Sequence, residues 1–112
     1  MAHRLGTSSS DILTAVDYLR SGGVVGVPTE TVYGLAASAF NVEAISEIYR
    51  LKGRPANNPL ILHIHDQDQI SQLAINVPDV LPRVVEAFWP GPLTVVLKSK
   101  TAVPDIVRAG GD

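Results

Sequence analysis

Short apolar runs of strand length alternate along this chain with segments that have the period of a helix. Residues 24–27 are valines interrupted by one glycine and closed by a proline, which is typical of a strand that opens into a loop. Residues 60–64 and 93–98 are further runs of this kind. Because segments with helical spacing lie before and between these runs, the sequence predicts a layered α/β fold with helices packed on a sheet.

The first two predicted helices carry their own start and stop signals. Serines at residues 8–10 can cap the first, which ends at Gly22, and Asn41 can cap the second, which ends at Gly53. Apolar residues recur at helical spacing in both segments. They are Ile12, Ala15, Val16 and Leu19 in the first helix and, as an apolar stripe, Ala44, Ile45, Ile48 and Leu51 in the second.

Two more helices are predicted in the second half of the chain. One runs through residues 70–74, and the other starts after residues 77–79, tolerates Pro82 in its first turn and ends at Trp89. Residues 101–112 contain prolines and glycines without a pattern for a closing helix or strand. We therefore expect the sequence to be a fragment of a longer protein rather than a chain with a loose terminus.

Composition and charge narrow the class of protein. The 112 residues fit one domain, 1–112, and 46% hydrophobic with 18% charged residues is a globular composition. The absence of cysteine excludes a disulfide framework, a thiolate metal site and a cysteine nucleophile, and it agrees with a cytoplasmic location. No signal-peptide core or membrane span is predicted. Since the net charge is -2, any anion site must come from a local cluster of lysine and arginine.

Polar groups are concentrated in residues 28–35, which follow the first predicted strand. The segment holds the hydroxyls of Thr29 and Thr31, the carboxylate of Glu30 and the phenol of Tyr33. Open α/β sheets place ligands at such strand ends. The alternative is a strand-to-helix connection, in which Thr29 caps a helix and Glu30 lies in its first turn.

Two cations lie at the end of the second predicted helix. Lys52 and Arg54 are separated by one glycine and followed by Pro55, which stiffens the backbone. Such a pair can hold a triphosphate or a carboxylate. The alternative is that they only interact with the dipole of the helix.

Two histidines, His63 and His65, share a face if residues 60–64 form a strand that persists. No third ligand has a convincing spacing, so no metal site is predicted. We interpret His63 as a hydrogen-bonding group that lines a pocket, with a satisfied core histidine as the alternative. Asp66 and Asp68 should form a solvated turn.

No standard glycine-rich phosphate loop occurs, but the ordered set of motifs resembles the YrdC/Sua5 family, the L-threonylcarbamoyladenylate synthases. The motifs are GGVVGVPTETVYGL at residues 22–35, KGRP at 52–55, NPL at 58–60 followed by His63, and WPGPLT at 89–94. This resemblance covers nearly the whole chain. It implies a YrdC-like fold with a twisted mixed sheet that is incomplete at the C-terminus, because the family domain is nearly twice as long and its later S-x-N element has no match here.

The resemblance also implies a reaction and its residues. ATP, bicarbonate and L-threonine would give threonylcarbamoyl-AMP with release of pyrophosphate. Thr31 and His63 match threonine contacts, and Arg54 and Asn58 match ATP contacts. Lys52 would meet bicarbonate or phosphate oxygens, and Lys52 and Arg54 would act catalytically by neutralising charge.

Further expectations from the resemblance concern the surroundings of the reaction. Thr29, Glu30 and Tyr33 would shape the pocket, with Glu30 a candidate proton acceptor. Mg²⁺ would accompany ATP, a threonylcarbamoyl-transferase complex would modify the adenosine beside the tRNA anticodon, and tRNA or double-stranded RNA could contact the protein weakly. Two alternatives stay open: an RNA- or nucleotide-binding module of the same fold without catalysis, and the carbamoyl-adenylate domain of a hydrogenase maturation protein.

Overall fold

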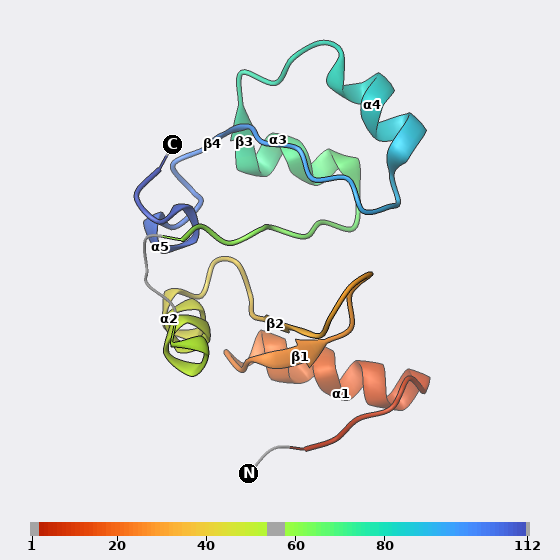
Figure 1. Ribbon diagram of the computed structural model, residues 1–112, viewed down its shortest axis with the longest axis vertical. Coiled ribbons are helices and arrows are strands. Elements are labelled where there is room, and N and C mark those ends of the chain that lie inside the picture. The colour runs from red at the N-terminus through yellow and green to blue at the C-terminus, as the bar shows by residue number, and fades with distance from the viewer. Residues whose placement is uncertain (1–2, 54–57, 112) are drawn as a thin grey trace. The chain divides into compact units, whose positions relative to one another are not determined.

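The computed structural model describes residues 3–53 and 58–111. The chain divides into two compact units, Met1–Pro55 and Ala56–Asp112. Each unit combines helices with a short pair of strands (Figure 1), so the predicted α/β class is confirmed. In place of one mixed sheet, the described residues form two separate two-stranded antiparallel sheets.

The first unit begins with helix α1, Ser9–Arg20, where the sequence predicts it. The Ser8 hydroxyl caps the helix by accepting a hydrogen bond from the N–H of Asp11. Just beyond the helix, Gly22 has φ +93°, which side chains other than that of glycine rarely allow. A Cβ at Gly22 would also lie 2.9 Å from the Nδ2 atom of Asn41, so the end of α1 is closely covered.

A β-hairpin follows α1. Strand β1, Val25–Val27, pairs antiparallel with β2, Gly34–Ala36, and the first residue of β1 lies opposite the last residue of β2. Residues 28–33 connect the two strands (Figure 1). The chain therefore returns as a strand, and the alternative in which Thr29 caps a helix is wrong.

Helix α2, Val42–Lys52, supplies the buried residues of the first unit. The Asn41 side chain accepts a hydrogen bond from the N–H of Ala44 at 3.0 Å, and Gly53 ends the helix with φ 63°. The buried side chains are Ala44, Ile45, Ile48 and Tyr49. Leu51, predicted as part of the stripe, is 52% exposed, because the buried face centres on Ile45 and Ile48 and leaves Leu51 at its margin.

The second unit begins with an extended segment and two short helical turns. The 3₁₀ helix η1, Gln67–Gln69, is capped by Asp66 and leads into α3, Ile70–Leu73. The predicted helix over residues 70–74 is thus shorter, since Ala74 already belongs to β3, Ala74–Ile75. The predicted solvated turn around Asp66 is confirmed by its exposure.

Helix α4, Leu81–Phe88, has the bounds that the sequence signals predict, with Pro82 in its first turn. The half-buried Trp89 that follows donates a hydrogen bond from Nε1 to the carbonyl of Leu93 at 2.9 Å. Strand β4, Lys98–Ser99, pairs antiparallel with β3.

Two of the predicted strands are not strands in the structure. Residues 60–64 and 93–97 are extended, and half-buried and exposed residues alternate along them. A β-strand needs backbone hydrogen bonds to a neighbouring strand, and within the described parts of the chain neither segment forms such a ladder. The start of the first segment is held instead by a hydrogen bond from the Leu60 N–H to the Val107 carbonyl at 2.9 Å.

The end of the chain contains a helical turn that the sequence pattern did not predict. Helix α5, Asp105–Arg108, contains the buried Val107, and Val103, two residues before the helix, is also buried. The guanidinium of Arg108 pairs with the Asp105 carboxylate and donates to the Gly111 carbonyl at 2.6 Å. The buried residues of the second unit are Ala74, Leu81, Val85, Val103 and Val107.

Candidate functional site

The hairpin connection, residues 28–33, brings together two of the predicted site residues. The Oγ1 atoms of Thr29 and Thr31 lie 3.4 Å apart, and the N–H of Thr31 donates to Thr29 Oγ1 at 3.3 Å. Thr29 Oγ1 also donates to the Val32 carbonyl. The threonine at the end of β1 therefore organises the turn through its own side chain.

The other polar residues of this connection face solvent. Glu30 is exposed, and Tyr33 is 78% exposed and Val32 73%. The connection of residues 28–33 therefore places a carboxylate, a phenol and two hydroxyls on the surface. Their exposure agrees with a surface that meets a ligand, and the pocket-shaping roles of Thr29, Glu30 and Tyr33 stay a prediction.

Lys52 is the last residue of α2 and is exposed. The neighbouring cation Arg50 is committed to an ion pair with Glu47, three residues earlier, and this hydrogen bond lowers the pKa of Glu47 and raises that of Arg50. No ion pair joins Lys52 to any residue that the structure describes. Lys52 is thus available to a ligand, whereas the other predicted cation, Arg54, lies outside the described residues.

The second unit carries Asn58 and His63, and both are exposed. Exposure rules out the alternative in which His63 is a core histidine. His65 lies on the same exposed side of the extended segment, as the alternation predicts, with Leu62 and Ile64 half-buried on the other. The two imidazoles of this segment are therefore exposed to solvent, whereas the aliphatic side chains that alternate with them are half-buried.

Neither metal ligation nor a membrane helix is indicated. Within residues 3–53 and 58–111, no three histidine, cysteine, aspartate or glutamate side chains gather as metal ligands would. Among the same residues, every helix is too short or too polar to cross a membrane.

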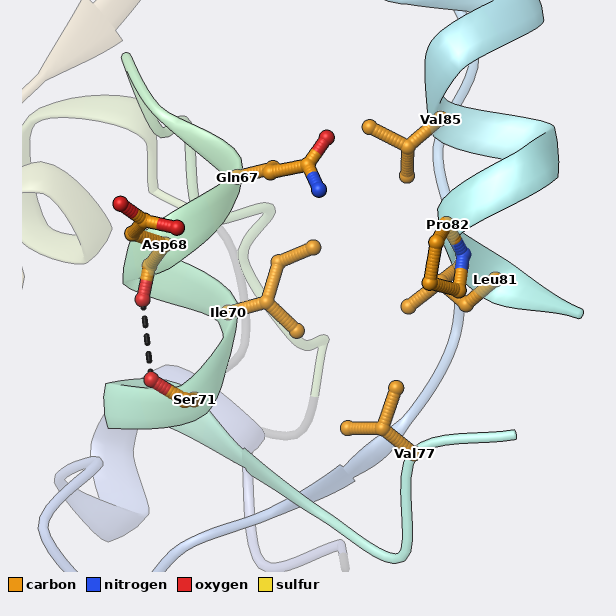
Figure 2. Close-up of a pocket in the computed structure, with 8 residues that line it drawn as sticks. All are labelled: Gln67, Asp68, Ile70, Ser71, Val77, Leu81, Pro82 and Val85. Carbon is orange, nitrogen blue, oxygen red and sulfur yellow. Dashed lines mark hydrogen bonds between the residues drawn. The ribbon is translucent and has the colours of Figure 1, made fainter. Parts of the chain in front are cut away.

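A pocket that the sequence did not predict lies within the second unit. It has a volume of about 350 Å³. Figure 2 shows Ile70, Val77, Leu81 and Val85 facing one another across it. Gln67, Asp68, Ser71 and Pro82 complete the lining. The i, i+4 spacing of Leu81 and Val85 on α4 is the sequence signal that could have located one wall. None of the predicted site residues that the structure describes lines this pocket.

The sequence matches the Sua5/YciO/YrdC family, which is described as "Telomere recombination", over residues 17–112. The chain belongs to the Sua5/YciO/YrdC family. The predicted resemblance is thereby confirmed. The match includes both the hairpin connection and the end of α2, so the exposed polar groups described above lie inside the family region.

Curated members of the Sua5/YciO/YrdC family are similar to most of this chain. The threonylcarbamoyl-AMP synthase of Pyrococcus abyssi is 45% identical over 90% of the chain and 30% of its own length. That of Bacillus subtilis is 46% identical over 95% of the chain and 31% of its own length. The chain therefore spans about a third of the length of these relatives.

Solved structures of the family agree with the fold. A double-alanine variant of Pyrococcus abyssi Sua5 superposes with a TM-score of 0.94 at 39% identity, covering 98% of this chain and 33% of that one. Pyrococcus abyssi Sua5 complexed with L-threonine gives a TM-score of 0.88 at 43% identity, covering 92% of this chain and 30% of that one.

Proposed function

We propose that this chain forms part of a threonylcarbamoyl-AMP synthase and supplies one wall of its active site. The observation that carries the proposal is the TM-score of 0.88, at 43% identity, with a Sua5 structure complexed with L-threonine. Identities of 45% and 46% with two synthases support the same reaction. The substrates would be L-threonine, bicarbonate and ATP, and the products threonylcarbamoyl-AMP, pyrophosphate and water.

The reaction has two bond-forming steps. The amine of threonine attacks the carbon of bicarbonate, and loss of water leaves a carbamate. A carbamate oxygen then attacks the α-phosphorus of ATP, and pyrophosphate leaves. Neither step needs a covalent bond to the protein, so positioning and charge neutralisation are the means of catalysis.

The predicted residues suit these steps chemically. Thr31 and His63 offer uncharged polar groups to threonine, and Asn58 offers an amide to ATP. Lys52 and Arg54 would neutralise the oxygens of carbamate and phosphates, which carry the negative charge. Support for the role of Lys52 comes from its exposure at the end of α2, beside an Arg50 that is already paired.

ATP would enter as its magnesium complex, with the cation held by phosphate oxygens and water. The product would pass, in the cytoplasm, to a threonylcarbamoyl-transferase complex that modifies the adenosine beside the tRNA anticodon. Weak contact with tRNA or double-stranded RNA belongs to the same proposal. These assignments follow from the proposed reaction and the family.

A chimaeric enzyme tests the proposal. The chain replaces the matching part of the Bacillus subtilis synthase, to which it is 46% identical. With ATP, L-threonine and labelled bicarbonate, we expect threonine-dependent formation of the labelled adenylate and of pyrophosphate. A chimaera that folds but forms no adenylate would refute the proposal.

Two variants of the chimaera test the role of Lys52. Lys52→Ala should lower turnover by about a hundredfold or more, as loss of a charge-stabilising group does. Arg20→Ala is the matched control, since Arg20 is also a basic residue in the last turn of a helix. If the two variants lose activity equally, Lys52 only interacts with the helix dipole and has no catalytic role.

A further inference from the structure

The side-chain amide of Gln69 holds a bend that follows the extended residues 60–64. These residues run toward α3 (Figure 1), and the chain bends at His65 and Asp66. Gln69 Oε1 accepts a hydrogen bond from the N–H of His65 at 2.7 Å and another from the N–H of Asp66 at 3.1 Å. An amide oxygen has two lone pairs, so the bend uses both of them.

The position of Gln69 is itself set by the helical turn that it ends. Gln69 is half-buried, and its own N–H donates to the Asp66 carbonyl at 3.0 Å. Asp66 in return caps η1 by accepting a hydrogen bond from the N–H of Asp68 at 3.0 Å. These reciprocal bonds form a capping box. The oxygen that receives the N–H of His65 therefore belongs to a folded element and not to a free side chain.

The opposite end of the extended segment is held by α5. The N–H of Leu60 donates to the Val107 carbonyl at 2.9 Å, and Val107 is only 4% exposed. Between these two points, residues 61–64 form no hydrogen bond with any other residue that the structure describes. The position of these residues along the segment is therefore set at its two ends.

This position decides which way His63 faces. Successive side chains alternate along an extended segment, so His63 is exposed whereas Leu62 and Ile64 are half-buried. A shift by one residue would turn the imidazole inward and the aliphatic side chains outward. His65 follows His63 by two residues, which span about 7 Å of extended chain. The bond from the His65 N–H to Gln69 thus opposes such a shift close to the imidazole.

We infer that Gln69 is a positioning residue for the site residue His63. The inference rests on the proposed function and deepens it by naming the group that fixes the imidazole before substrate arrives. A contact residue that is already in place costs less ordering free energy on binding. Gln69 acts through the backbone of His65, because both lone pairs of its amide oxygen are occupied there.

The first test uses the chain alone and needs no ligand. Gln69→Leu removes the acceptor, so the amides of His65 and Asp66 should exchange with water several-fold faster in NMR spectra. Gln69→Glu keeps an acceptor that capping boxes also use and should retain the wild-type rates. Gln72→Leu is the matched control, since Gln72 is exposed on α3 and its side chain bonds to none of the described residues. Unchanged exchange in Gln69→Leu would overturn the inference.

The second test measures the KM for L-threonine in the chimaera. Gln69→Leu should raise this KM about two- to tenfold, the equivalent of one hydrogen bond, whereas Gln69→Glu and Gln72→Leu should not. Because Gln69 acts through His63, adding Gln69→Leu to His63→Ala should raise the KM no further. A general loss of stability would instead make the two effects add. Additive effects would therefore overturn the positioning role.

The two tests separate failure of the inference from failure of the proposed function. A folded wild-type chimaera that forms no adenylate refutes the proposed function and, with it, the role of Gln69 toward substrate. In that case the amide exchange still decides whether Gln69 holds the bend. An active chimaera whose KM for L-threonine is insensitive to Gln69→Leu refutes the inference alone.

Discussion

Gly53 lies between the two cations of the KGR motif, and its replacement by alanine tests how the end of α2 is built. The residue has φ 63°, and a Cβ at this position would meet nothing within 4 Å. Its N–H donates to the Arg50 carbonyl, a bond that alanine can also make. Gly53→Ala therefore changes the backbone preference alone, without a steric clash or a lost hydrogen bond.

The expected magnitude is the difference between two opposing effects. A left-handed conformation costs a residue with a Cβ about 1–2 kcal/mol. The alanine also restricts the unfolded chain, which returns about 0.4–1 kcal/mol. We expect Gly53→Ala to lower the free energy of unfolding by about 1 kcal/mol, which corresponds to a fall in Tm of about 4–8 °C for a small domain.

Gly26 provides the matched control for this experiment. It lies in β1, a Cβ there would also meet nothing within 4 Å, and its φ is not in the left-handed range. Urea unfolding followed by circular dichroism should place Gly53→Ala below both the wild type and Gly26→Ala. If the two variants unfold at the same urea concentration, the left-handed cap does not stabilise the end of α2 as argued.

Three further predictions concern α2. Ile45→Ala should lower the free energy of unfolding by about 2–5 kcal/mol, because Ile45 is buried. The control Val42→Ala, at a half-exposed position, should change it by less than about 0.5 kcal/mol. Equal urea midpoints for the two variants would contradict this prediction. Asn41→Ala should cost about 1 kcal/mol in the same assay through loss of the N-cap, and an unchanged midpoint would argue against the cap. NMR titration should find the pKa of Glu47 below its ordinary value because Arg50 donates to it, and Arg50→Gln should restore it. Since the pKa of Glu47 is depressed in the folded state, its ion pair with Arg50 stabilises the fold above the unfolded pKa, and this stabilisation is lost as pH falls through the folded pKa. A Glu47 that titrates with its ordinary pKa would contradict this contribution.

The helices were predictable from sequence because their signals are local. The hydroxyl of Ser8, the amide of Asn41 and the left-handed Gly53 act within one turn of the helix they bound. The exception is α5, which is a single turn that buries Val107, and a single turn is too short for periodicity to register.

The strands were less predictable because pairing is not a local property. Residues 60–64 have the apolar alternation of a strand, but the ladder depends on a second segment that the pattern does not name. Strand β2, Gly34–Ala36, was missed for the opposite reason, since three residues that begin with glycine have little β-propensity. The connection of residues 28–33 also lacks the two-residue turn that signals a tight hairpin.

The candidate site was predictable at the level of residue types. The order of motifs identified the family, and the exposure of Thr31, Lys52 and His63 agrees with residues that meet a ligand. The hydrogen bond of the Thr29 hydroxyl was not predictable, because it depends on the turn that folds the Val32 carbonyl back toward it. The family resemblance implied that Thr29 shapes the pocket, which stays a prediction, and in the structure Thr29 forms hydrogen bonds within the turn.

Gly22 and Asn41 place a constraint on how this chain can change over evolution. Position 22 needs glycine for its φ of +93° and also because Asn41 would lie 2.9 Å from any Cβ there. Shortening the side chain at 41 would relieve the crowding but remove the cap of α2, and it would leave the backbone requirement in place. No single substitution at position 22 or 41 therefore removes the constraint on the residue at the other position. Among relatives that keep this turn, we expect glycine at 22 to persist even where the residue at 41 varies.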